Sequence, residues 1–402
     1  MVVGEVAVET DAVVIGGGPG GYAAAIRLGQ LGQNVVLVEK ETLGGVCLNR
    51  GCIPSKALIH AAGEFYKLSG MSRLGIRLPA GQASFSMEDW QAWKTSVVSQ
   101  LNKGVARLCQ ANNVTVVKGS AVFLSADRIG VETEGDFEIY KFQHAVIASG
   151  SRPLIPVFLA PDGKHILDST DALSLAEVPG TLVVVGGGYI GMELGMAFAK
   201  LGAKVTVIEA AERILPQTAP HLVQEVKKQA RKLGMIIKTG TRVEAAETGD
   251  GRVRLDLSSE ANGREQLETE KVLVAIGRVP NTDALGLSQA GVEADGRGYI
   301  PVEPTCRTNV PHIYAIGDVT PGPALAHRAS KQGIVAAEAI AGLPSSVDSP
   351  YVPYVIFTEP QIAGAGLTRE EAERQGDSVK TGVFPYRANG RAVATGEADG
   401  VA

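Results

Sequence analysis

The sequence predicts an α/β protein with two similar doubly wound domains and the beginning of a third, α+β domain. The main observation is a repeat. The stretch DAVVIGGGPGGYAAAIRLGQLGQNVVLVEK from Asp11 returns as TLVVVGGGYIGMELGMAFAKLGAKVTVIEA from Thr181, 170 residues later. Each copy reads as a buried strand, a glycine turn, a helix and a second buried strand. At 402 residues the chain is also too long for one ordinary core, which favours several domains.

Both glycine turns carry the spacing GxGxxG, with Gly16, Gly18 and Gly21 in the first copy and Gly186, Gly188 and Gly191 in the second. Such glycines permit a tight turn, close approach of a pyrophosphate and close packing of the next helix, whose N-terminus attracts negative charge. In each copy the second strand ends on an acid, Glu39 or Glu209, 23 residues after the first glycine. Two unrelated glycine-rich turns are the alternative, but the strand, helix and acid in both copies favour two Rossmann-like dinucleotide-binding domains.

An acid at this position accepts hydrogen bonds from ribose hydroxyls. Glu209 would also repel a 2′-phosphate, so we expect the second site to prefer NAD to NADP. Two dinucleotide sites in one chain suggest two cofactors that exchange electrons, a flavin (FAD) with a nicotinamide (NAD).

The rest of the chain is interpreted around the two copies. Residues 64–112 look helical, with Trp90 and Trp93 expected in the core and flavin stacking as the alternative. Residues 114–148 and 235–276 alternate as antiparallel meanders do. We expect domain boundaries near residues 150, 276 and 345, with an N-terminal FAD-binding part over 1–150 and an NAD-binding domain over 151–276.

The composition of the chain argues against several classes of function. The net charge of −5 gives no basic face for nucleic acid and no polybasic membrane patch. No apolar run reaches membrane-spanning length, and the N-terminus MVVGEVAVETD carries early acids, so we expect a cytoplasmic chain without a targeting segment. Its partners should be small molecules or proteins, and no metal site is expected. Four cysteines are too few for a secreted disulfide framework, so a bridge would more readily be catalytic than structural.

Two of these cysteines lie in the stretch LGGVCLNRGCIPSKALIH, as Cys47 and Cys52. On a regular helix residues five apart have Cα atoms about 8 to 9 Å apart, too far for a disulfide. A bridge therefore requires a bend, which Gly51 permits, and Pro54 suits the first turn of a following helix. Cys52 would then lie at a helix N-terminus, where a thiolate is favoured. The alternative is a pair of buried free cysteines. Cys109 and Cys306 are interpreted as structural.

The segment GGVCLNRGCIPSK resembles the active-site signature of the pyridine nucleotide-disulfide oxidoreductases, specifically the dihydrolipoamide dehydrogenases. The resemblance continues through GGGYIGMELG, VAIGRVPNT, YAIGDV, LAHRA and FTEPQIAGAG. Mercuric reductases are similar but carry an extra C-terminal cysteine pair, and glutathione reductases place basic residues after the second strand, where this chain reads IEAAER. Arg213 is the one basic residue in that stretch, and it is the one feature there that weakens the expectation of NAD specificity.

The resemblance implies a redox-active Cys47–Cys52 disulfide, with Cys47 as the interchange thiol and Cys52 against the flavin. Lys56 would contact the isoalloxazine ring and pair with Glu193. It further implies that FAD is bound by Gly16, Gly18, Gly21, Glu39, Lys56, Gly119, Asp318 and Ala326. NAD would be bound by Gly186, Gly188, Tyr189, Gly191, Glu209, Val243 and Gly277.

The resemblance also implies a homodimer that serves the 2-oxo acid dehydrogenase complexes, acting on their lipoyl domains and docking on the acyltransferase core. In the family a histidine near the C-terminus acts as the base across the dimer, and this sequence has no histidine after His327. The resemblance thus implies a central FAD part over 277–345 and an incomplete interface domain over 346–402, and we expect a shortened form with a doubtful dimer. Because general-base assistance contributes about 10² to 10⁴ in rate, its lipoamide step should slow by that factor. The alternatives are an NADH diaphorase-like flavoprotein and a non-catalytic docking subunit.

Overall fold

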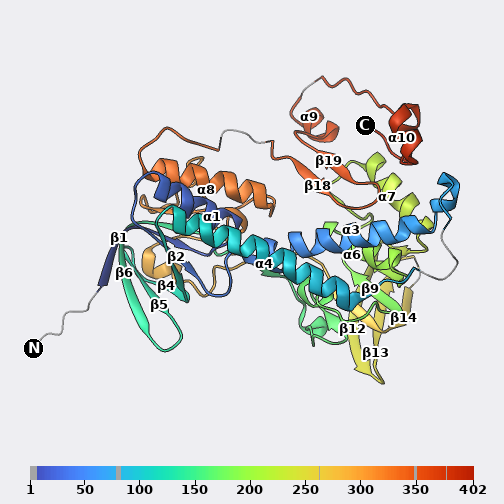
Figure 1. The fold of residues 1–402 in the computed structure, drawn as a ribbon, viewed down its shortest axis with the longest axis horizontal. Helices are drawn as coiled ribbons and strands as arrows, with labels where there is room; N and C mark the ends of the chain where they lie inside the picture. Colours follow the sequence, from blue (N-terminus) through green and yellow to red (C-terminus); the bar gives the residue numbers. More distant parts are fainter. Residues whose placement is uncertain (1–6, 78–82, 262, 348–350, 377) are drawn as a thin grey trace, which may run out of the picture. The chain divides into compact units, whose positions relative to one another are not determined.

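The computed structural model describes residues 7–77, 83–261, 263–347, 351–376 and 378–402. It separates into two compact units, each assembled from three stretches of chain (Figure 1). The first unit comprises residues 1–54, 94–152 and 278–350, and the second comprises 55–93, 153–277 and 351–402. Each unit contains one copy of the repeat. These units are defined by compactness, whereas the predicted domains are defined by the cofactor that each would bind. The predicted boundaries at 150, 276 and 345 therefore stay predictions.

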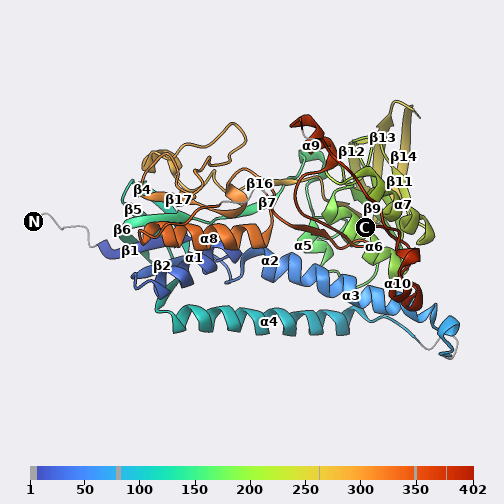
Figure 2. The ribbon, with the colours of Figure 1, turned by 90° about the horizontal axis from the view of Figure 1, so that it is seen from above.

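The first unit is built on a seven-stranded sheet of order β3-β2-β1-β6-β5-β4, with β17 added on β6. Strands β1, β2, β3, β6 and β17 run parallel, whereas β4, β5 and β6 form an antiparallel meander. Helix α1 packs side by side with α8 (Figures 1 and 2). The elements of this unit are β1 (Ala7–Ile15), α1 (Pro19–Gln30), β2 (Val35–Glu39), α2 (Gly45–Arg50), β3 (Val114–Lys118), β4 (Ser120–Ser125), β5 (Arg128–Glu132), β6 (Phe137–Ile147), β16 (Arg278–Pro280), η3 (Leu287–Ala290), β17 (Ile313–Ala315), η4 (Gly317–Val319) and α8 (Ala326–Ile340).

The second unit contains a five-stranded parallel sheet of order β11-β10-β9-β15-β8 and a three-stranded antiparallel sheet, β12-β13-β14. Its elements are η1 (Met71–Leu74), η2 (Val157–Leu159), β8 (Ile166–Leu167), α5 (Ser169–Ala172), β9 (Thr181–Val185), α6 (Tyr189–Lys200), β10 (Lys204–Ile208), α7 (Pro220–Lys232), β11 (Ile236–Lys238), β12 (Thr241–Gly249), β13 (Arg252–Ser259), β14 (Gly263–Thr269), β15 (Lys271–Val274), β18 (Tyr354–Ile356), β19 (Ile362–Gly364), α9 (Arg369–Arg374), η5 (Tyr386–Ala388) and α10 (Gly390–Thr395). Three elements continue along the chain from one unit into the other: α3 (Cys52–Leu68), α4 (Met87–Ala111) and β7 (Ser151–Pro153).

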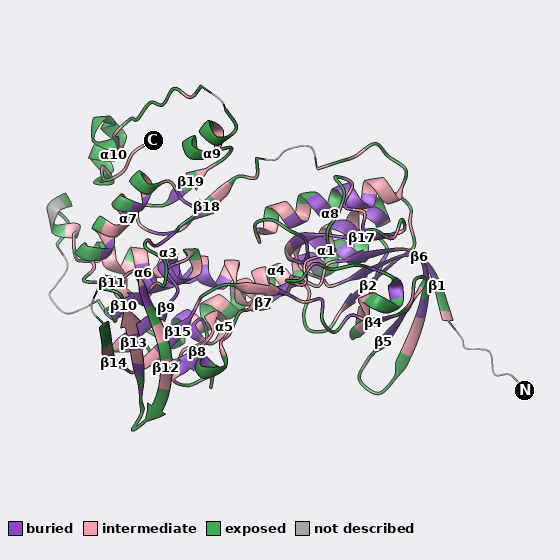
Figure 3. Ribbon diagram, turned by 180° about the vertical axis from the view of Figure 1, so that it is seen from behind, coloured by how far each residue is buried: buried purple, intermediate pink, exposed green. Residues whose placement is uncertain are grey.

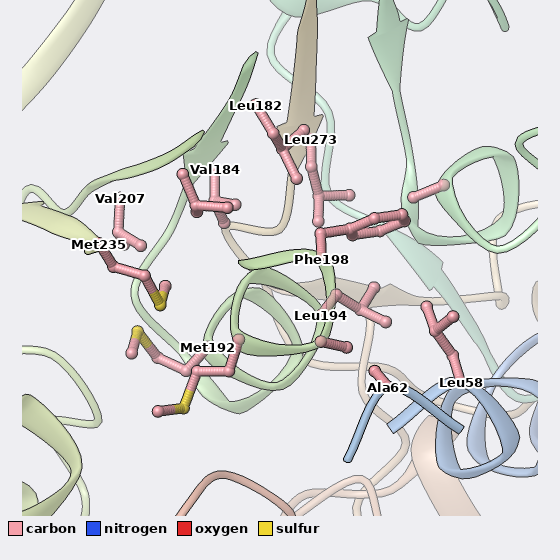
Figure 4. Close-up of a cluster of buried hydrophobic side chains, with 14 of the residues drawn as sticks. Leu58, Ala62, Leu182, Val184, Met192, Leu194, Phe198, Val207, Met235 and Leu273 are labelled. Atoms are coloured by element: carbon pink, nitrogen blue, oxygen red, sulfur yellow. The ribbon is translucent and has the colours of Figure 1, made fainter. Parts of the chain in front are cut away.

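The buried strands and the inner faces of the helices form the cores of the two units (Figure 3). In the second unit, α6 packs on its sheet through side chains that include Leu194 and Phe198 (Figure 4). Leu58 and Ala62 of α3 belong to the same cluster. Leu58, Leu194 and Phe198 are each at most 1% exposed. Burial of each such side chain contributes about 1.5 to 3 kcal/mol, so this cluster fixes the orientation of α6 and α3.

Some expectations about secondary structure were wrong. Trp90 is 4% exposed as predicted, but Trp93 is 46% exposed and is not a core residue. Side chains three positions apart on a helix are neighbours but do not point in the same direction. Trp90 therefore lies on the apolar face of α4, and Trp93 lies beyond its edge. The helical interpretation of 64–112 holds for α3, the short η1 and α4 and fails over residues 75–77 and 83–86, while residues 78–82 lie outside the described structure.

The two meanders are present but shorter than predicted. Strand β3 pairs in parallel with β2, and β11 pairs in parallel with β10. Strand β15 also joins a parallel sheet, through β9. A residue period of two predicts a strand but not the direction of its partner, so the sequence pattern could not separate these strands from the meanders.

Candidate active site

The first glycine turn, between β1 and α1, has the shape that a pyrophosphate requires. Gly16 is left-handed, with φ +106°. A Cβ on Gly21 would lie 1.8 Å from the carbonyl oxygen of Gly16, so only glycine fits where α1 meets the turn. At Gly18 the nearest atom to such a Cβ would be the Gly45 Cα, 3.9 Å away. The surface at Gly18 is therefore open to a ligand.

The second turn, between β9 and α6, repeats this geometry. Gly186 has φ +109°. A Cβ on Gly191 would lie 2.1 Å from the carbonyl oxygen of Gly186, whereas a Cβ on Gly188 would meet no described atom within 4 Å. The turn therefore also leaves one open glycine at the N-terminus of a twelve-residue helix, which is a suitable place for a phosphate.

The two acids that end the second strands make matching hydrogen bonds. The Oε2 atom of Glu39 accepts the N–H of Gly17 at 2.7 Å, and the Oε2 atom of Glu209 accepts the N–H of Gly187 at 2.6 Å. In both, Oε1 accepts a backbone N–H two residues later, at 2.9 Å for Glu39 and 2.7 Å for Glu209. A carboxylate has about four acceptor positions, so each can also accept ribose hydroxyls.

Cys47 and Cys52 form a disulfide with a Cα separation of 4.6 Å. Helix α2 ends at Arg50, the backbone turns at Gly51 with φ −130° and ψ −107°, and α3 begins at Cys52. The predicted bend and the position of Cys52 at a helix N-terminus are both confirmed. The dipole of α3, a 17-residue helix, therefore favours negative charge on the Cys52 sulfur when the bridge is reduced.

The helix that carries Cys47 packs directly on the first glycine turn. Gly44 donates its N–H to the carbonyl of Gly17 at 2.7 Å. A Cβ on Gly45, at φ +58°, would lie 2.7 Å from the Gly18 Cα. Asn49, which the sequence reasoning did not single out, fixes this segment by donating to the carbonyl oxygen of Gly45 at 2.9 Å. The disulfide thus belongs to the first nucleotide turn, not to the second.

Lys56, one helical turn after Cys52 on α3, pairs with Glu193 of α6 at 2.8 Å between Nζ and Oε2. Glu193 is 3% exposed, and its other oxygen accepts the backbone N–H of Phe357 at 2.8 Å. The Lys56 Nζ also lies 4.6 Å from the centre of the Phe357 ring. The predicted ion pair is therefore present, and Phe357 is a neighbour that sequence reasoning missed.

Asp318, in the short helix η4, is the centre of a second polar group. Its Oδ2 accepts the hydroxyl of Ser151 at 2.6 Å. The Ser151 hydroxyl in turn accepts the Nε–H of Arg278 at 2.7 Å, and the Ser151 carbonyl accepts Nη2 of Arg278 at 2.6 Å. Ser151 and Arg278 were also missed by sequence reasoning, although both stand beside glycines that mark strand ends in GSRP and IGRVPN.

Other predicted FAD residues lie at the carboxyl ends of the first sheet. Gly119 joins β3 to β4 and donates its N–H to the carbonyl of Glu39 at 3.1 Å, so the structure brings these two together. A Cβ on Gly119 would lie 2.5 Å from the carbonyl oxygen of Glu132, which excludes larger residues. Ala326 is the first residue of α8.

The predicted NAD residues are less uniformly arranged. Tyr189 is the first residue of α6, directly after Gly188, and is 41% exposed. Gly277 has φ +150°, and its carbonyl accepts the N–H of Leu154 at 2.9 Å. Val243 lies in β12 and packs, half-buried, against the apolar cluster that contains Val185 and Val274. The assignment of these three residues to NAD stays a prediction.

The remaining cysteines are buried, as suits the structural role that the sequence analysis gives them. Cys109 and Cys306 are free and fully buried. Burial raises the pKa of the Cys306 thiol to about 12 and also raises the pKa of the Cys109 thiol. Among the described residues, no group of three or more His, Cys, Asp or Glu side chains is arranged to hold a metal ion. None of the helices in the described ranges is long and apolar enough to span a bilayer.

Together these features fit a dinucleotide in each unit. Both glycine turns have an open position that a Cβ would occupy, and both have an acid with spare acceptor positions beside it. The first unit has, in addition, the disulfide and the Asp318 group.

Comparison with known proteins agrees with this arrangement. Residues 10–333 match the family "Pyridine nucleotide-disulphide oxidoreductase", and residues 352–402 match the dimerisation domain of the same family. The chain is 47% identical to a dihydrolipoyl dehydrogenase of Geobacillus stearothermophilus and 48% identical to one of Staphylococcus aureus. Each alignment covers 100% of this chain and 84% or 85% of the relative.

Solved structures show the same fold. The flavoprotein disulfide reductase RclA from Escherichia coli, as a Cu(II) complex, superposes with a TM-score of 0.85 at 29% identity, covering 98% of this chain and 85% of that one. LpdA from Mycobacterium tuberculosis superposes with a TM-score of 0.89 at 26% identity, covering 97% and 86%. The family uses FAD and NAD, as the two glycine turns predicted. This chain therefore belongs to the pyridine nucleotide-disulphide oxidoreductase family, and within it to the group of the dihydrolipoyl dehydrogenases.

Proposed function

We propose that this protein oxidises dihydrolipoamide with NAD⁺, giving lipoamide, NADH and a proton. The observation that carries the proposal is the Cys47–Cys52 disulfide, held against the first of two dinucleotide turns by the contact between Gly45 and Gly18. A disulfide at that place exchanges electrons with a dithiol on one side and with a nucleotide cofactor on the other.

We assign FAD to the first unit and NAD to the second. FAD is held by the turn around Gly18, by Glu39 and by Asp318, and NAD by the turn around Gly188 and by Glu209. FAD bound in this way supplies a two-electron carrier between the cysteine pair and the nicotinamide. The boundaries at residues 150, 276 and 345 remain part of this proposal.

The cysteines perform the thiol chemistry. A substrate thiolate attacks the sulfur of Cys47, which breaks the disulfide and forms a mixed disulfide, while Cys52 leaves as a thiolate. The second substrate thiol, after losing its proton, attacks the substrate sulfur bound to Cys47. This closes the lipoamide ring and releases Cys47 as a second thiolate. The N-terminus of α3 stabilises the charge on Cys52, which makes Cys52 the better leaving group of the pair.

Lys56 and Glu193 hold charge beside this chemistry. Glu193 is buried and fixes the Lys56 ammonium at 2.8 Å. A fixed ammonium one turn after Cys52 on the same helix provides positive charge where electrons arrive. Removal of either partner would leave the charge of the other without a counter-charge. For a fully buried pair this lowers the stability by about 3 to 5 kcal/mol, and the loss is smaller here because Lys56 is partly exposed.

The proposed partners follow from the same relatives. The substrate is carried on a lipoyl domain of a 2-oxo acid dehydrogenase complex, and the acyltransferase core is the docking partner. The match of residues 352–402 to a dimerisation domain supports a homodimer. A cytoplasmic location suits these partners.

The proposal is tested by NADH formation from dihydrolipoamide and NAD⁺ with purified, flavin-loaded protein, beside the Cys47→Ser variant. Turnover that disappears in the variant is the expected result. Dye reduction by NADH without any dihydrolipoamide oxidation would favour the diaphorase alternative. Docking without NADH oxidation would favour the non-catalytic subunit.

A further inference from the structure

Phe357 contacts both members of the Lys56–Glu193 pair. Its backbone N–H donates to Oε1 of Glu193 at 2.8 Å, while the ammonium of Lys56 donates to Oε2 of the same carboxylate at 2.8 Å. The carboxylate is 3% exposed, so these two donors are what keeps its charge hydrogen-bonded away from water. Any displacement of Phe357 therefore changes the position of the carboxylate that holds Lys56.

The ring of Phe357 adds a direct contact to the lysine. Its centre lies 4.6 Å from the Lys56 Nζ, within the roughly 6 Å range of cation–π attraction. The side chain of Lys56 is 32% exposed, so water reaches it from one side. The carboxylate and the ring together restrict the ammonium to one orientation.

Phe357 is itself fixed along α6. It directly follows β18, and Thr358 after it is 5% exposed. Two residues further on, Glu359 forms an ion pair with Lys200, whose side chain is 7% exposed. Glu193 and Lys200 are seven residues apart on α6, and both contact the segment from Phe357 to Glu359. This segment is thus attached to α6 at two points, two helical turns apart.

We propose that Phe357 is a positioning residue of the redox centre, which holds Lys56 in its working orientation through the ring and through the N–H on Glu193. The inference rests on the proposed function, in which the fixed ammonium of Lys56 provides positive charge beside the chemistry of the cysteine pair. It assigns a role to the part of the chain that matches the dimerisation domain, because Phe357 lies within residues 352–402.

The first test is a double-mutant cycle of Phe357→Leu with Lys56→Met, read as the rate of flavin reduction by NADH. Phe357→Leu keeps the backbone N–H and removes the ring, and it should slow the reaction about 2- to 10-fold, the range of a cation–π contact on a partly exposed ammonium. Phe357→Tyr retains an aromatic face and should restore the rate. With Lys56→Met already present, Phe357→Leu should have no further effect. A full additional loss in the double variant would overturn the proposal.

The second test reads Lys56 without turnover and without flavin. Acylation of lysines by a water-soluble N-hydroxysuccinimide ester is followed by peptide mass spectrometry, with the exposed Lys67 on the same helix as the internal reference. An amine tied to a carboxylate and a ring must break both contacts before it reacts. Phe357→Leu should therefore accelerate Lys56 labelling about 2- to 10-fold in apoprotein as well as in flavin-loaded protein.

Phe65→Leu is the matched control, since Phe65 is a half-buried ring of the same unit, tilted at 59° against the Phe85 ring with the ring centres 5.8 Å apart. It should leave Lys56 labelling unchanged. If Phe357→Leu does not fold, Phe357→Met takes its place, because Met fills a similar volume without a ring. Equal labelling of Lys56 in the wild type and in the ring-less variant would overturn the proposal. If NADH fails to reduce the wild-type flavin, the proposed function fails, while the labelling result still decides the role of Phe357.

Discussion

The first and second glycine turns are nearly the same structure built from different residues. Gly16 and Gly186 have φ values of +106° and +109°. Ile15 pairs with Val38 in the first sheet and Val185 pairs with Ile208 in the second, each across 23 residues. The shared spacing therefore fixes not only the turn but also the register of the two central strands, so the two proposed nucleotide sites have the same frame.

What differs is the segment after the second strand. In the first unit, β2 leads into α2 and the cysteine pair, which pack on the glycine turn. In the second unit, β10 leads to α7, an amphipathic helix over Pro220–Lys232 whose buried residues are apolar. In the proposed function, the nucleotide-binding frame therefore serves the redox chemistry of the cysteine pair in the first unit and binds NAD in the second. Variants of the two units should separate the redox role from the nucleotide-binding role, and they are ordered here from the largest expected effect to the smallest.

The largest effect is expected from Cys52→Ser. Without this sulfur no disulfide forms, so dihydrolipoamide oxidation should fall by at least about 10³-fold, the loss that is typical when a nucleophile is removed. Dye reduction by NADH depends on the two nucleotide sites and should persist. Both rates are measured on the same flavin-loaded sample.

Cys109→Ala is the control for that variant, because Cys109 is buried and its pKa is raised by burial, so it does not act as a thiolate. Its activity should stay within about twofold of the wild type, with a small loss of stability from the lost packing. A comparable loss of activity in Cys109→Ala would contradict the assignment of the redox pair.

A second pair of variants distinguishes the packed glycine from the open one in the second turn. Gly191→Ala forces a Cβ against the Gly186 carbonyl and should destabilise the protein by about 1 to 3 kcal/mol. Gly188→Ala meets open space, so the free energy of unfolding should change by less than about 0.5 kcal/mol. Its Kd for NADH should nevertheless rise about tenfold, because a methyl group occupies the place of the pyrophosphate.

These two variants are compared by thermal unfolding and by NADH titration, with flavin absorbance as the control for the first unit. Both should retain flavin. Loss of flavin from Gly188→Ala, with NADH binding intact, would reverse the assignment of the two sites.

A smaller effect is expected for nucleotide choice. Glu209→Gln removes the negative charge that opposes a 2′-phosphate, so the ratio of kcat/KM for NADPH over NADH should rise about tenfold, or about 1.4 kcal/mol. Glu39→Gln is the matched variant in the first unit and should leave the ratio unchanged. An equal shift in both variants would mean that Glu209 does not face the nucleotide ribose.

The smallest effect is expected for the ion pair between Arg27 of α1 and Glu338 of α8, two helices of the first unit. Hydrogen bonds from Ser345 and Arg27 lower the pKa of the Glu338 carboxyl. The Arg27–Glu338 pair is partly exposed, so Arg27→Met should cost only about 0.5 kcal/mol near pH 7. A depressed folded pKa gives stability that is fully present above the ordinary glutamate pKa of about 4.3 and is lost as the pH falls from there through the lowered pKa of the folded state. The difference in unfolding free energy between variant and wild type should therefore shrink on acidification. A difference that grows in acid would contradict this origin.

The parts of the fold that local spacing controls were predictable from the sequence. The two turns, their acids, the bend at Gly51 and the position of Cys52 all depend on residues close together in the chain. Parallel pairing of β3 and β11 was not predictable, because an alternating pattern does not specify the partner strand. Phe357 was missed because it is 164 residues from Glu193. Ser151 and Arg278 are likewise 127 residues apart, and no periodicity connects them.

The most direct test of the account is an anaerobic titration of the flavin-loaded protein with dihydrolipoamide, followed by visible absorbance. If the first unit holds both the flavin and the redox disulfide, reduction proceeds in two steps. The first step should produce a long-wavelength band beside the flavin peaks, from a thiolate at Cys52, and Cys52→Ser should lack this band. Direct bleaching of the flavin without any long-wavelength band, in wild type and variant alike, would contradict the claim that the cysteine pair is the electron carrier of the first unit.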